Sequence, residues 1–161
     1  MASLEDIKKV ISKIPDPEIP VISIKELGVL RNIFYEEDSL KIVITPTYSG
    51  CPAMDRFQKD IIEKLEHLKV KNYEIKMQFD PAWTTDWITE EAKEKLRDYG
   101  IAPPAHKTKD KNILLGNKQR IECPRCKTNE TELVSQFGST ACKSMYRCTS
   151  CLEPFEYFKC L

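Results

Sequence analysis

Hydrophobic residues recur at steps of three or four in three stretches of the chain, at residues 3–16, 52–68 and 89–100. This spacing puts them on one side of a helix, so each stretch is predicted to form an amphipathic helix. At the start of the first stretch, Ser3 and Asp6 have the spacing of a capping box. A helix with one apolar face needs a surface to cover, and the sequence therefore predicts a sheet beneath these helices.

Three runs rich in β-branched and aromatic residues, at 28–35, 40–45 and 73–79, predict the strands of that sheet. The first two are separated by four polar residues and are typical of a β-hairpin. The third follows the second helix, so strand, helix and strand form a βαβ-like unit. We therefore predict an α+β fold with a small mixed sheet and helices on one face, followed by a small C-terminal β domain.

One isolated cysteine, Cys51, lies in the loop between the second predicted strand and the second helix. Ligands of α/β sheets gather at the carboxyl ends of strands, where this loop begins. Unpaired N–H groups at a helix start favour an anion, so we expect a thiolate to form more easily at Cys51. A buried, inert thiol is the alternative interpretation.

Four of the seven cysteines form two Cys-x-x-Cys motifs, Cys123 with Cys126 and Cys148 with Cys151, separated by 21 residues. This spacing is typical of a zinc ribbon, in which four thiolates bind one tetrahedral ion. Structural zinc is the expected cofactor, although iron takes the same ligand set. Strand character at residues 131–137, 144–147 and 155–158 supports a β ribbon around these motifs.

Composition divides the chain into a domain at 1–101, a basic linker at 102–120 and the ribbon at 121–161. The linker contains two prolines and five Lys or Arg residues, which is typical of a solvated tether. Two further cysteines, Cys142 and Cys160, fall in the ribbon. Each is a spare thiol, an exchange ligand or a packed residue, and packing is our default expectation.

The charges balance, with 25 Lys and Arg against 25 Asp and Glu, which argues against a nucleic-acid binder. The N-terminus lacks the basic and apolar regions of a secretion signal, and no apolar stretch is long enough to span a bilayer. We therefore expect a cytoplasmic protein. In that reducing compartment the cysteines indicate metal or thiol chemistry rather than disulfides.

Asp16-Pro17-Glu18 and Thr47-x-x-Gly50-Cys51-Pro52 resemble the motifs of the metal-sulfur cluster biosynthesis domain, shared by SufT and the cytosolic iron-sulfur targeting factors. With Trp83-Thr84-Thr85-Asp86-Trp87 and the two cysteine pairs, the whole chain is similar to the PaaD family of phenylacetate degradation, encoded with a multicomponent phenylacetyl-CoA epoxidase. The resemblance implies a reactive cysteine at Cys51, with an acidic motif at Asp16 and Glu18 nearby.

The same resemblance implies an accessory role, with no catalytic residues of its own, in maturing iron-sulfur or iron centres of the epoxidase. The chain lacks the Glu-x-x-His pairs of a di-iron oxygenase and a glycine-rich nucleotide loop. Expected partners are epoxidase subunits, especially an iron-sulfur reductase, and a second copy of the chain. A transient iron-sulfur cluster is the expected cargo, with Cys51 as one of its ligands.

Two other functions compete with maturation. A scaffold would bind epoxidase subunits through the ribbon and the surface of Trp83 and Trp87, with a structural metal alone. A thiol enzyme would need a general base beside Cys51, and the chain has two histidines, His67 and His106. His67 is predicted near the far end of the helix that begins after Cys51, which weakens the enzyme hypothesis.

Overall fold

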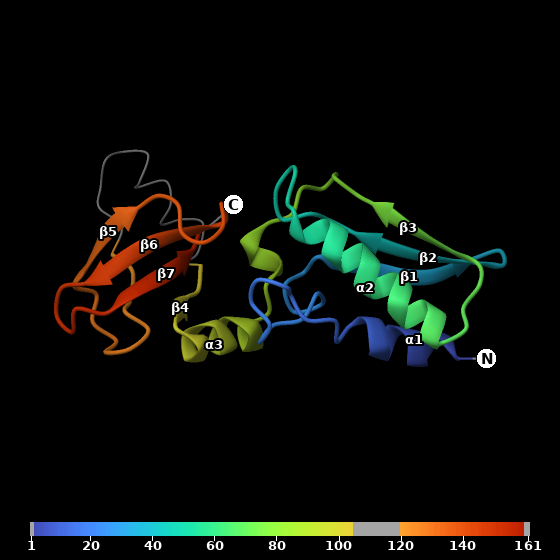
Figure 1. The fold of residues 1–161 in the computed structure, drawn as a ribbon, viewed down its shortest axis with the longest axis horizontal. Coiled ribbons are helices and arrows are strands. Elements are labelled where there is room, and N and C mark those ends of the chain that lie inside the picture. The colour runs from blue at the N-terminus through green and yellow to red at the C-terminus, as the bar shows by residue number, and fades with distance from the viewer. Residues whose placement is uncertain (1, 105–119, 160–161) are drawn as a thin grey trace. The chain divides into compact units, whose positions relative to one another are not determined.

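The first sheet is built around a parallel pair of strands (Figure 1). Strands β1 (Leu30–Glu36) and β2 (Ser39–Ile44) form the predicted hairpin, and β3 (Tyr73–Met77) joins the other edge of β2 in parallel. Parallel neighbours need a long connection, which helix α2 (Ala53–His67) provides. The mixed sheet and the βαβ-like unit are therefore as predicted from the sequence.

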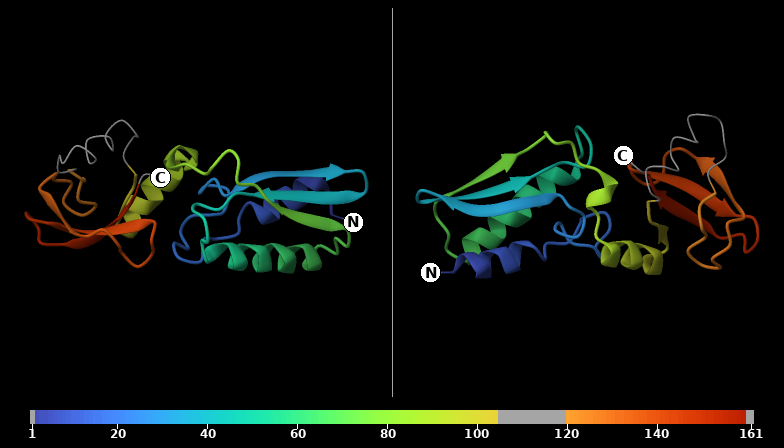
Figure 2. Two further views of the ribbon diagram at one scale, coloured as in Figure 1. Left: turned by 90° about the horizontal axis from the view of Figure 1, so that it is seen from above. Right: turned by 180° about the vertical axis from the view of Figure 1, so that it is seen from behind.

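Burial of one face of β2 fixes the position of α2. Leu40, Ile42 and Ile44 alternate along β2 and have no solvent exposure. Helix α2 lies across this side of the sheet as a separate layer, seen from above in Figure 2. Helix α1 (Leu4–Ile11) has the predicted capping box and packs beside α2. The helices contribute their predicted apolar stripes to this core, namely Ile7, Ile11, Met54, Phe57, Ile61 and Leu65.

The apolar face of β3 is less covered than its alternating sequence predicts. Tyr73 and Ile75 are half-buried, but Met77 is 37% exposed and Phe79, beyond the end of the strand, is 61% exposed. Because β3 is an edge strand, it lacks the cover on both flanks that β2 receives.

The computed structural model describes residues 2–104 and 120–159, which divide into two units. The first runs to Trp83 and includes Trp87–Thr89, and the second contains Thr84–Asp86 and continues from Glu90. Most of the predicted linker, and also Cys160 and His106, lie outside the described residues.

Helix α3 (Glu90–Tyr99) and strand β4 (Ile101–Ala102) belong to the second unit, whereas the sequence places them before a boundary at residue 101. The physical reason is that β4 pairs in parallel with β7 (Pro154–Phe158). Between the units' main elements, the chain also forms a short 3-10 helix, η1 (Thr85–Trp87).

The second sheet has the strand order β4-β7-β6-β5. Strands β5 (Thr131–Ser135), β6 (Lys143–Cys148) and β7 are antiparallel and correspond to the three strands expected in the ribbon. Its core includes cysteine as well as aromatic and aliphatic side chains: Ala102, Ile121, Cys123, Tyr146, Cys148, Phe155 and Tyr157. None of the helices in the described residues has the length and apolar character needed to cross a membrane.

Both tryptophans contact the segment that leads into β1. The indole Nε1 of Trp83 donates a hydrogen bond to the carbonyl oxygen of Leu27 at 3.0 Å, and Trp83 is 4% exposed. The Arg31 guanidinium lies 3.6 Å from the ring centroid of Trp87. The tryptophans therefore cover the core of the first unit, as in the simpler of the sequence interpretations.

Replacement of Gly28 by Ala should destabilise the first unit by about 3 kcal/mol, since φ is positive there and a methyl group would collide with Trp87. An added Cβ would lie 2.7 Å from the Cβ and 2.9 Å from the carbonyl oxygen of Trp87. Gly50→Ala is the matched control, because Gly50 also has positive φ but open space around it, and it should cost about 1 kcal/mol. Urea unfolding followed by tryptophan fluorescence measures both, and equal losses would contradict the steric argument.

Candidate functional site

Cys51 lies in the loop that connects β2 to α2, immediately before the helix cap. Pro52 is the cap residue, and the Cys51 carbonyl accepts a hydrogen bond from the Met54 N–H at 3.2 Å. The side chain is half-buried, and the Thr47 hydroxyl donates to its sulfur at 3.6 Å. Gly50 has φ of 77° and no atom near the position of an added Cβ. The thiol is thus held at a helix start beside an open turn rather than enclosed in the core.

The acidic motif forms a local turn. Asp16 is 6% exposed, and its Oδ1 accepts hydrogen bonds from the N–H groups of Glu18 at 2.8 Å and Ile19 at 2.7 Å. Within the described residues, the only group of three or more Cys, His, Asp or Glu side chains able to share a metal ion is the four-cysteine group of the second unit. The structure therefore does not bring Asp16, Glu18 and Cys51 together as a ligand set.

Four sulfur atoms converge in the second unit. The Sγ atoms of Cys123, Cys126, Cys148 and Cys151 all lie within 4.8 Å of one another. The distance from Cys123 to Cys151 is 3.8 Å, and that from Cys126 to Cys148 is 3.5 Å. Tetrahedral zinc with bonds of about 2.3 Å requires sulfur atoms about 3.8 Å apart, so these four side chains fit such an ion.

The two cysteine loops have the same backbone geometry. In one, the Cys123 N–H donates to the Thr128 carbonyl at 2.9 Å, and in the other, the Cys148 N–H donates to the Glu153 carbonyl at 2.9 Å. The residue after each second cysteine has positive φ, 65° at Lys127 and 63° at Leu152. The matching lengths of the two Cys-x-x-Cys motifs are the sequence signal for this repeated turn, beyond the ligand spacing that they predict.

The crowded thiols differ in acidity. Burial disfavours the Cys148 thiolate, but the N–H groups of Cys151 and Ser150 and the Cys126 thiol outweigh it and lower the pKa of Cys148 to about 7. The Glu153 N–H favours the Cys151 thiolate, yet burial and the neighbouring thiols raise the pKa of Cys151 to about 12. One thiolate forms readily and others follow only when a cation offsets their repulsion, which is the chemistry of a metal site.

Two residues of the alternative hypotheses lie elsewhere. Cys142 is half-buried near the Thr140 hydroxyl, 3.0 Å from its sulfur, and is not part of the four-cysteine group. His67 ends α2, 15 residues long, so it lies about 20 Å from the helix start at 1.5 Å per residue. Its imidazole cannot serve as a base for Cys51.

A full-length relative combines the same two parts in one chain. Over 158 residues the chain is 46% identical to an Escherichia coli protein that is named as a subunit of 1,2-phenylacetyl-CoA epoxidase, covering 98% of this chain and 93% of that protein. The chain belongs to the PaaD family. The family model described as the PaaD zinc beta ribbon domain matches residues 107–159, and the model described as iron-sulfur cluster assembly protein matches residues 4–77.

The N-terminal part of this PaaD family member has shorter relatives. A Porphyromonas gingivalis protein named Fe-S protein maturation auxiliary factor is 36% identical over 94 residues, covering 57% of this chain and 89% of that protein. The crystal structure of a domain of unknown function, DUF59, from Bacillus anthracis is 23% identical with a TM-score of 0.52, covering 58% of this chain and 90% of that one. The latter likeness shows the fold alone.

Replacing Asp16 by Ala should destabilise the first unit by about 2 kcal/mol, because two backbone N–H groups lose a carboxylate acceptor. Glu18→Ala is the control: its side chain is exposed, and we expect a change of no more than about 0.5 kcal/mol. Denaturant midpoints measure both variants. A stable Asp16→Ala protein would show that the carboxylate is not required by the turn.

Proposed function

We propose that this protein is an accessory factor that helps to assemble iron-sulfur or iron centres of a phenylacetyl-CoA epoxidase system, with Cys51 as the functional thiol. The names of its relatives support an accessory or maturation role. The observation that carries the proposal is a half-exposed sulfur at a helix start, within the residues that match the cluster-assembly model. The partner would be an iron-sulfur reductase subunit, and the cytoplasm would keep the thiol reduced.

In the proposed step, the Cys51 thiolate donates an electron pair to an iron atom of the cluster, which is cargo. One sulfur cannot hold a cluster, so a second thiolate comes from another copy of the chain, a client or a small thiol. A client thiolate then replaces Cys51 at the iron, and the released Cys51 takes up a proton. Each exchange is redox neutral, because one thiolate replaces another.

We also propose that Cys123, Cys126, Cys148 and Cys151 hold a structural zinc ion. The sulfur separations and the unequal acidity of the thiols support this ligand set. Bound zinc would supply a fixed positive charge that permits four thiolates to pack together. In this role the ion stabilises the ribbon and takes no part in the exchange at Cys51.

A scaffold is the second candidate function, and exposed apolar side chains in the ribbon favour it. Leu133, Val134, Phe137 and Leu152 are between 49% and 67% exposed. Such residues can bind an epoxidase subunit without any thiol chemistry. A scaffold would form its complex equally well with or without Cys51.

Cys51→Ser should lower the iron-sulfur content of the epoxidase reductase in cells, since an alcohol is a poor ligand for cluster iron. Cys142→Ser is the matched control, because Cys142 is also half-buried but lies outside both candidate sites. Cluster content is measured by iron and sulfide analysis of the purified reductase. Unchanged content with Cys51→Ser, together with an intact complex, would leave the scaffold as the function.

Cys126→Ser should remove bound zinc and unfold the ribbon, because the remaining thiolates cannot complete a tetrahedral site and the small core does not fold alone. Metal analysis and proteolysis of the full chain measure both effects. Cys142→Ser should keep one zinc per chain. Full zinc retention in Cys126→Ser would contradict the assignment of this ligand.

A further inference from the structure

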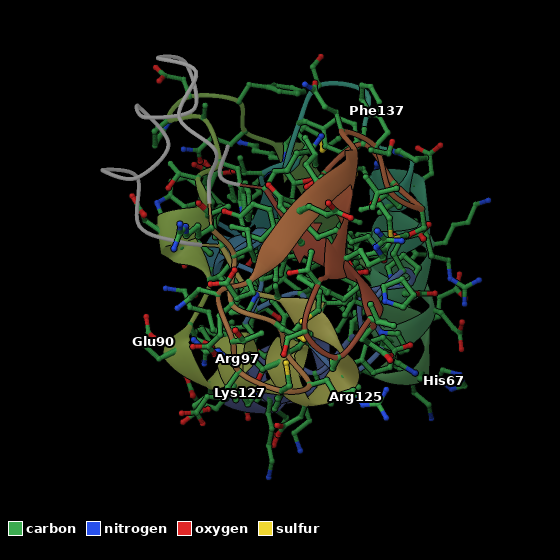
Figure 3. The ribbon with its side chains drawn as sticks, turned by 90° about the vertical axis from the view of Figure 1, so that its left-hand side faces the viewer. His67, Glu90, Arg97, Arg125, Lys127 and Phe137 are labelled. Carbon is green, nitrogen blue, oxygen red and sulfur yellow. The ribbon has the colours of Figure 1, made fainter. Side chains whose placement is uncertain are left out.

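A cavity of about 370 Å³ lies in the second unit, apart from Cys51 and from the four sulfur atoms. One wall is formed by α3, through Glu90, Lys93 and Arg97. The other wall is the segment from Arg120 to Glu122, which leads to the first cysteine loop. Figure 3 shows Glu90 and Arg97 extending from α3. Residues from two separate stretches of the sequence therefore face one polar space.

The cavity has an excess of positive charge. The Lys93 ammonium pairs with the Glu90 carboxylate at 2.8 Å, and this pair is neutral overall. The guanidinium groups of Arg97 and Arg120 have no acidic partner among the described residues, and one carboxylate, that of Glu122, lines the cavity with them. Two unpartnered guanidinium groups repel each other unless an anion lies between them.

The framework that holds these groups is rigid. Ile121, next to Arg120, is 4% exposed, and its N–H and carbonyl both bond to the Thr131 hydroxyl, at 3.3 and 2.7 Å. Lys93 and Arg97 are four residues apart and share one face of a helix. The floor includes Ala102, which is 2% exposed in β4. Cationic groups thus surround a preformed apolar floor.

The geometry points to a binding site for a phosphate group, carried by a small organic phosphate or present as the free ion. Arginine presents paired N–H donors that match phosphate oxygens, and two such groups with Lys93 nearby suit a dianion better than a single carboxylate. A volume of 370 Å³ is enough for a small ligand but not for a folded protein element. This site is independent of the proposed role of Cys51.

The test uses the full-length, zinc-loaded protein with two probes, inorganic phosphate and adenosine 3′,5′-bisphosphate. Binding is followed by NMR of the arginine Nε–Hε groups at low ionic strength. We expect saturable shifts at Arg97 and Arg120. Arg97→Gln and Arg120→Gln should each weaken binding of the bisphosphate at least fivefold. Tighter binding of the bisphosphate than of phosphate would identify an organic phosphate as the ligand, and equal affinities would identify the free ion.

Arg147→Gln is the control for charge, since Arg147 is exposed, pairs with Glu132 at 2.6 Å and does not line the cavity. It should leave binding unchanged. Absence of saturable shifts at Arg97 and Arg120 would overturn the proposal. An equal loss of affinity in Arg147→Gln and Arg97→Gln would also overturn it, because it would show attraction to net charge alone.

Discussion

Parallel pairing of β2 with β3 is the constraint on which the first unit depends. The chain must leave the carboxyl end of β2 and return through α2 before β3 can pair, so a loop at that end is unavoidable. Complete burial of Leu40, Ile42 and Ile44 fixes the register, because a slip of one residue would turn this face to solvent. Cys51 therefore occupies a place that the topology creates, where a strand end and a helix start meet.

The second unit depends on a different interaction. Two of its four clustered cysteines, Cys123 and Cys148, are completely buried and belong to the hydrophobic core itself. Both cysteine loops adopt the same turn, with a left-handed residue after the second cysteine and a matching backbone hydrogen bond. The Arg125 guanidinium joins the loops by its ion pair with Glu153 at 2.6 Å. Ligand geometry and folding are consequently coupled in this unit.

Periodic patterns predicted the helices, the hairpin and the parallel unit, because each of these depends on residues near in sequence. Alternation along β3 predicted an inner face but not its cover, so the exposure of Met77 was missed. The placement of α3 was missed for a related reason: β4 has two residues, too few for a pattern, and pairs with a distant strand. For the candidate sites, spacing was sufficient to group the four cysteines. It could not place Arg97 beside Arg120, since tertiary packing alone brings them to one cavity.

The two kinds of sulfur site differ in what they can exchange. A tetrahedral ion bound by four thiolates has no open position, and a ligand can leave only if the surrounding turn also opens. Loss of metal there is therefore opposed by the folding energy of the ribbon. A single thiolate at Cys51 has the opposite property, because it always needs a ligand from outside the chain to complete a cluster. Incompleteness makes release as easy as capture, and a delivery factor needs both steps.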